Sequence, residues 1–84
     1  MQLPRKSDHL KIKGVITPKD RDKGGNVVQV LIETSNFERY TIADNKVGRE
    51  LIDLLGKEVM IHGVVSGEDL DGSEILFVQK YEVC

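Results

Sequence analysis

Short segments in which polar and apolar residues alternate make up most of this chain, and this spacing constrains its fold more than any other feature. The segment from His9 to Ile16 shows the alternation most clearly. In an extended chain, a period of two places Leu10 and Ile12 on one face and Lys11 and Lys13 on the other. The spacing therefore predicts a first β-strand with one buried face and one exposed face.

Four further segments have the alternation or the β-branched composition that is typical of strands. They are separated by turn-forming residues, notably the Gly-Gly-Asn sequence at 24–26 and the acidic, glycine-containing stretch 66–73. In the third strand, Tyr40 shares a face with Ile42, so we expect Tyr40 in the core. The four predicted strands are Val27–Glu33, Glu38–Ala43, Lys57–Val65 and Ser73–Val83.

The period changes to that of a helix between the third and fourth strands. Asp44 or Asn45 is suited to cap its start, and Gly56 is suited to end it in a left-handed conformation. Gly48 weakens such a helix by about 1 kcal/mol relative to alanine, so we expect the helix to depend on packing. Four apolar residues lie at i, i+4, i+7 and i+8 on its buried face: Val47, Leu51, Leu54 and Leu55.

The predicted order is thus β-β-β-α-β-β, with Gly14 inside the first strand and Gly63 inside the fourth. At Gly14 a bulge or a sharp bend is expected, which a small barrel needs to close. This order, together with the segments Lys13–Ile16 and Gly56–Val64, resembles the OB-fold family and in particular small bacterial OB-domain proteins without an established activity. The resemblance implies a mainly β fold, a five-stranded Greek-key barrel with one helix between strands three and four. It covers about residues 9–83. We expect one OB-type domain over 9–84, preceded by a flexible tail at 1–8.

Composition limits the function of the domain. Its 84 residues suffice for one core and leave little material to enclose a deep pocket. The formal net charge is −2, so the clear cationic excess of a sequence-independent nucleic-acid binder is missing. Cys84 is the one cysteine, the N-terminus lacks the apolar run of a signal peptide, and no apolar run is long enough to cross a membrane. We therefore expect a cytoplasmic location and no membrane partner.

The resemblance also implies a binding surface, because OB barrels bind along strands two and three and the loops 1–2 and 4–5. By position, Gln29, Leu31 and Thr41 fall on this surface, and Phe37 supplies an aromatic ring on which a base can stack. Alternating charges at 19–23, with Glu33, Glu38 and the acids of 68–71, weaken its positive field. The candidate residues for single-stranded DNA or RNA are Lys11, Lys13, Lys19, Arg21, Lys23, Phe37 and Arg39.

An alternative function is a protein-interaction or assembly module with no nucleic-acid role. It would form a homo- or hetero-oligomer through an exposed strand edge or through the apolar side of the last strand. In the last strand, Ile75, Phe77, Tyr81 and Val83 are in register, yet Leu76 and Val78 are apolar on the opposite side. A barrel strand needs only one apolar face, so the second one is available to a partner protein or to a second copy of the chain.

Catalytic and metal-binding patterns are missing from the sequence. No serine lies in a nucleophile-elbow context, and the glycines at 24–25 precede a strand instead of the helix that a phosphate loop needs. His9 and His62 are expected on adjacent strands, as solvated side chains without a metal. The acidic turn 69–74 lacks the flanking helices and ligand series of a calcium loop. We therefore predict a protein that is not an enzyme and has no cofactor.

Overall fold

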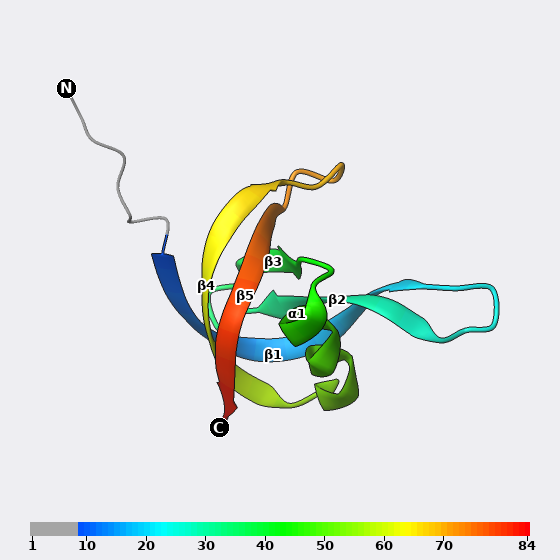
Figure 1. Ribbon diagram of the computed structural model, residues 1–84, viewed down its shortest axis with the longest axis horizontal. Helices are drawn as coiled ribbons and strands as arrows, with labels where there is room; N and C mark the ends of the chain where they lie inside the picture. Colours follow the sequence, from blue (N-terminus) through cyan, green and yellow to red (C-terminus); the bar gives the residue numbers. More distant parts are fainter. Residues whose placement is uncertain (1–8) are drawn as a thin grey trace.

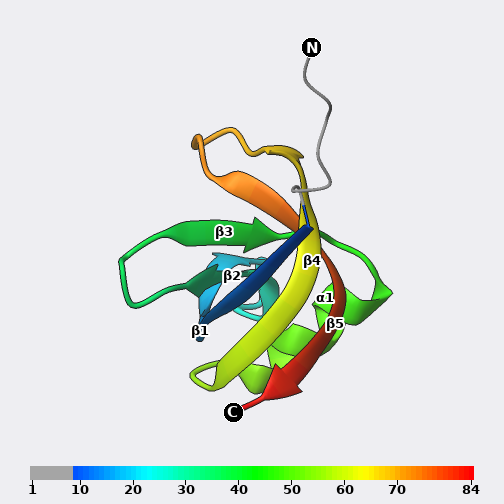
Figure 2. The ribbon, with the colours of Figure 1, turned by 90° about the vertical axis from the view of Figure 1, so that its left-hand side faces the viewer.

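The computed structural model describes residues 9–84, and the predicted tail at 1–8 lies outside the described residues. Its five strands form one closed barrel in the order β1-β2-β3-β5-β4, with a short helical segment between β3 and β4 (Figures 1 and 2). This is the predicted OB-type barrel. The elements are β1 (His9–Arg21), β2 (Val27–Glu33), β3 (Arg39–Ile42), α1 (Lys46–Glu50), the 3-10 helix η2 (Leu51–Leu54), β4 (Glu58–Glu68) and β5 (Glu74–Val83).

Strand β1 is long enough to pair with two different strands of the barrel. Its first half pairs with β4, from His9 to Val15, and its second half pairs with β2, from Val15 to Arg21. Gly14 lies where the two halves meet, and a β-carbon there would be 2.8 Å from Cγ1 of Ile32 and closer still to the carbonyl oxygen of Glu33. A close approach of β1 and β2 therefore requires glycine at this position.

The two internal glycines differ in the register of the strands around them. The pairing of β4 with β5 shifts between His62 and Gly63, so a bulge interrupts this pair of strands next to Gly63. No shift occurs at Gly14, and the irregularities of β1 lie between Pro18 and Arg21 instead. The expected bend at Gly14 thus takes the form of a change of partner strand without an extra residue.

The barrel interior is filled by aliphatic side chains from every strand and from η2. In β5 the residues that enter the core are Leu76 and Val78, while Phe77 points outward and is 41 % exposed. Leu76 is directly opposite the buried Ile42 of β3, and directly paired residues face the same side of a sheet. The buried core consists of Ile12, Ile16, Val30, Ile32, Ile42, Leu51, Val59, Ile61, Leu76 and Val78.

The helix begins where the sequence indicated and changes form after five residues. The Asn45 side chain accepts a hydrogen bond of 2.9 Å from the backbone N–H of Gly48, which makes Asn45 the N-cap. The chain tightens into the 3-10 helix η2 from Leu51, which is fully buried. Gly56 follows with a φ of 81°, the left-handed conformation predicted for it.

Candidate functional site

The outer face of β2 and β3, where the resemblance places the binding surface, is less open than expected. Thr41 is only 1 % exposed, so its predicted place on an exposed surface is wrong. It lies directly between Leu31 of β2 and Ile75 of β5, and its hydroxyl is 2.7 Å from Oγ of Ser73. The parallel pairing of β3 with β5 brings these neighbours together. Gln29 and Leu31 are half-buried.

Lys19, one of the predicted cations of this surface, takes part in two ion pairs. Its Nζ lies 2.6 Å from Oδ2 of Asp71 and 3.4 Å from Oδ2 of Asp69, and its side chain is 16 % exposed. The hydrogen bond to Asp71 raises the pKa of Lys19 and holds the pKa of Asp71 well below its usual range. The acids of the β4–β5 loop therefore neutralise this lysine.

The other predicted cations of this side are spread out. Arg21 and Lys23 lie at the far end of the β1–β2 hairpin, which projects from the barrel (Figure 1). The guanidinium of Arg21 donates a hydrogen bond of 3.0 Å to the carbonyl of Gly25. Nε of Arg39 lies 3.6 Å from Oε2 of Glu33, so this charge is also partly compensated. The structure does not gather these three residues into one site.

Two of the predicted residues do meet, in a groove of about 490 Å³ between β1, the β2–β3 turn and the start of β4. Lys13 lines it from β1, and Phe37, which is 81 % exposed, lines it from the turn. Glu33 and Glu58 also line the groove, so it carries charges of both signs. The remaining lining residues are Gly14, Val15, Thr17, Thr34 and Ser35.

The β2–β3 turn holds Phe37 in this exposed position. Its backbone N–H donates a hydrogen bond of 2.9 Å to the carbonyl of Thr34, and its φ of 66° is uncommon for a residue with a side chain. The Thr34 hydroxyl accepts hydrogen bonds from the N–H groups of Asn36 and Glu38, at 3.2 and 3.1 Å. Hydrogen bonds to the hydroxyl and to the carbonyl of Thr34 thus fix the turn that holds the Phe37 ring in its exposed position.

A second exposed surface was missed by the sequence reasoning, and we call it the β1–β4–β5 face. The odd-numbered positions of β1 and the even-numbered positions of β4 point outward, because Ile12 and Ile61 between them are buried. Lys80, which was not predicted as a site residue, lies directly opposite His62. Three cross-strand rows make up the face: His9–Val64–Phe77, Lys11–His62–Lys80 and Lys13–Met60–Glu82.

The two histidines lie on adjacent strands, as predicted, but not side by side. His9 is opposite Val64 and His62 is opposite Lys11, so the histidines are diagonal neighbours. Among the residues that the structure describes, no three histidine, cysteine, aspartate or glutamate side chains are grouped so as to hold a metal ion.

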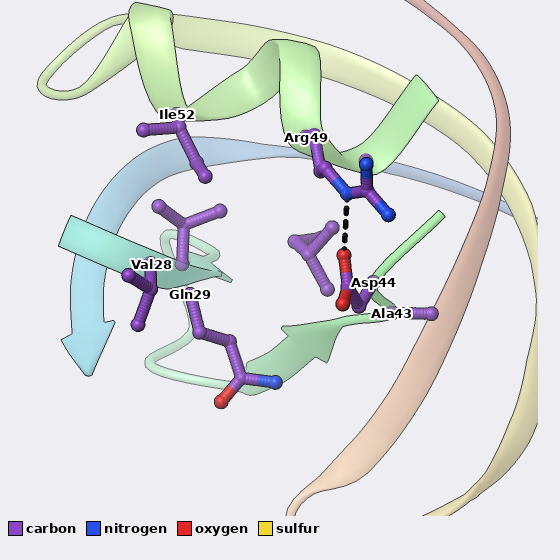
Figure 3. A pocket seen from close by; sticks show the side chains of 9 residues that line it. Val28, Gln29, Ala43, Asp44, Arg49 and Ile52 are labelled. Atoms are coloured by element: carbon purple, nitrogen blue, oxygen red, sulfur yellow. Dashed lines mark hydrogen bonds and ion pairs between the residues drawn. The ribbon is translucent and has the colours of Figure 1, made fainter. Parts of the chain in front are cut away.

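A small cavity lies between β2, the end of β3 and the helix (Figure 3). Its volume is about 10 Å³, which is room for no more than one water molecule. Val28 and Gln29 of β2 line one side, and Ile52 of η2 faces them. Arg49 reaches across its rim, with Nε 2.7 Å from Oδ1 of Asp44. This cavity is too small to take a ligand.

Comparison of the chain with known proteins finds no similar family, protein or structure. No protein-family model matches the chain, and neither the curated proteins nor the solved structures contain a match. Over residues 9–84, no helix has the length and the apolar character that crossing a membrane requires.

Proposed function

We propose that this chain is a small OB-type binding module for single-stranded nucleic acid and that it acts without catalysis. The observation that carries the proposal is the meeting of Lys13 and Phe37 in one groove, with Lys11 two residues further along the exposed face of β1. Single-strand binders combine cations that follow the phosphate backbone with aromatic rings on which the bases stack. OB-type barrels bind oligonucleotides on their outer surface.

The charges around the groove set the expected strength of binding. Stacking of one base on Phe37 contributes about 1–3 kcal/mol. Glu33 and Glu58 in the same groove repel phosphate, and the net charge of −2 gives no long-range attraction. We therefore expect weak binding with a dissociation constant of about 10⁻⁵ M at low salt, in the range of sequence-independent binders.

Fluorescence anisotropy with a fluorescein-labelled oligothymidine tests the proposal. The wild-type chain is expected to bind saturably and to lose affinity as salt is added. Phe37→Ala is expected to weaken binding about fivefold or more, the equivalent of about 1 kcal/mol of lost stacking. The matched control is Leu70→Ala, since Leu70 is a fully exposed apolar residue outside the groove. Absence of saturable binding below about 100 µM contradicts the proposal.

A second candidate function, self-association, has one observation in its favour. Strand β5 buries Leu76 and Val78 in the core and still presents Phe77 on its outer side. Light scattering over a range of protein concentrations tests this function. A dimer mass that Phe77→Asp abolishes supports it, and a monomer mass that stays constant with concentration contradicts it.

A further inference from the structure

We infer that single-stranded nucleic acid lies diagonally across the β1–β4–β5 face, from the groove at Lys13 over the row Lys11–His62–Lys80 toward Phe77, and not along the β2–β3 face that the OB resemblance implies. This inference rests on the proposed function and specifies where the strand runs. It adds Lys80 and Phe77, two residues outside the predicted site, to the binding surface.

The two faces differ in how their positive charges are compensated. On the β2–β3 side, Lys19 and Arg39 each lie within ion-pair distance of a carboxylate. On the β1–β4–β5 face, none of the three lysines lies within ion-pair distance of a carboxylate among the described residues. The nearest carboxylates in register are Glu82 in the third row and Glu58 opposite Val15. Uncompensated cations are what a phosphate backbone needs, because binding then releases condensed counterions without first breaking an ion pair.

The register of the strands brings these charges close together. Neighbouring strands are about 4.8 Å apart, so the backbones of Lys11 and Lys80 lie about 10 Å apart on either side of His62. This separation is close to the Debye length of about 8–10 Å, so the two charges are only partly screened from each other. A polyanion lying over the row removes this repulsion and is therefore bound more favourably than by either lysine alone.

The row continues into the groove of the proposed function. Along the outer side of β1, Val15 and Lys13 belong to the groove, Lys11 to the row, and His9 to the row that ends at Phe77. From Val15 to His9 the chain makes six residue steps, which span about 20 Å along β1. An aromatic ring thus lies near each end of a cationic path, with room for about six nucleotides at the stacked spacing of about 3.4 Å.

A charge reversal with a matched control tests the path. The variants are Lys80→Glu and Lys46→Glu, because Lys46 is an exposed lysine at the start of α1 that is likewise in no ion pair within the described residues. The probe is the labelled oligothymidine, titrated at several salt concentrations. Lys80→Glu is expected to weaken low-salt binding about tenfold and to flatten the plot of log affinity against log salt by about 0.7 or more, the contribution of one phosphate contact. Lys46→Glu is expected to change neither quantity beyond a small uniform shift.

Phe77→Ala supplies a second, uncharged readout. It is expected to weaken binding about fivefold through lost stacking and to leave the salt slope unchanged. Circular dichroism of each variant shows whether the barrel has formed.

Each result points to a distinct conclusion. If the wild-type chain does not bind the oligonucleotide, the proposed function itself is wrong. If Phe37→Ala weakens binding while Lys80→Glu and Phe77→Ala behave like Lys46→Glu, the function stands and the path across the β1–β4–β5 face is refuted. If polyglutamate binds as tightly as the oligonucleotide and responds equally to Lys80→Glu, the face is a site for acidic protein, and the inference is overturned.

Discussion

Replacing Gly14 with alanine tests the close approach of the backbones of β1 and β2. The new methyl group would be 2.8 Å from Cγ1 of Ile32, and nearer to the carbonyl of Glu33, whereas carbon atoms prefer about 3.5–4.0 Å. That carbonyl belongs to the paired strand β2, so neither neighbour moves freely. Overpacking of this kind costs about 1–3 kcal/mol. Each kcal/mol lowers Tm by about 4–8 °C in a domain of this size, so we expect a decrease of about 5–20 °C.

Thermal and urea unfolding followed by circular dichroism measures this effect. The urea midpoint should fall without a change in the dependence on denaturant, because the same surface is exposed on unfolding. Gly24→Ala is the control, since the nearest atom to its β-carbon would be Nδ2 of Asn26, at 3.3 Å in an exposed turn. Its unfolding free energy should change by about 0.5 kcal/mol or less. A Gly14→Ala variant as stable as Gly24→Ala would refute the close approach of β1 and β2.

Three further predictions concern the polar groups that fix the loops and the helix. The hydrogen bond from Lys19 keeps the pKa of Asp71 in the folded protein below its usual 3.8. The charged carboxylate therefore stabilises the fold above about pH 4, and this contribution is lost as the pH falls further. Tm of Asp71→Asn should fall less than that of wild type between about pH 4 and pH 2, and an equal fall contradicts the ion pair. Asn45→Ala removes the N-cap and should cost about 1 kcal/mol in urea unfolding, and an unchanged midpoint would mean that packing alone holds the helix. Thr41→Val removes the hydroxyl pair with Ser73 and should destabilise by about 1 kcal/mol, whereas a more stable variant would show that the pair contributes nothing.

The local features of this fold could be predicted from the sequence, because they depend on neighbouring residues. Alternation placed Ile12 in the core and Lys11 outside. The change of period located the helix and left Asp44 or Asn45 as its cap, of which Asn45 is the one that caps it. The chain order β-β-β-α-β-β then identified the barrel. In each case the physical cause lies within a few residues of the feature: strand pleat, helical turn or capping side chain.

Features that depend on the exact register of strands distant in sequence were wrong or were missed. Alternation alone assigned Thr41 to the exposed side, but its burial follows from parallel pairing with β5, more than thirty residues later. Lys19 forms an ion pair with Asp71, which is 52 residues away in the sequence. The alignment of Lys11 with Lys80 passes through two strand pairings and a bulge next to Gly63. Such juxtapositions require the register, which a single sequence does not contain.

The division of β1 between two partner strands has a consequence for folding. Its first half pairs with β4, and we call this pairing the seam of the barrel. The seam joins residues as far apart in the sequence as His9 and Val64. Pairings so distant in sequence lose much chain entropy and slow folding. Because Lys11 and His62 lie on opposite sides of the seam, any ligand that lies across both binds only the closed barrel. Such a ligand raises the free energy of unfolding by mass action, about 2.7 kcal/mol at one hundred times its dissociation constant. Closure of the barrel and occupancy of its charged face are then one linked equilibrium.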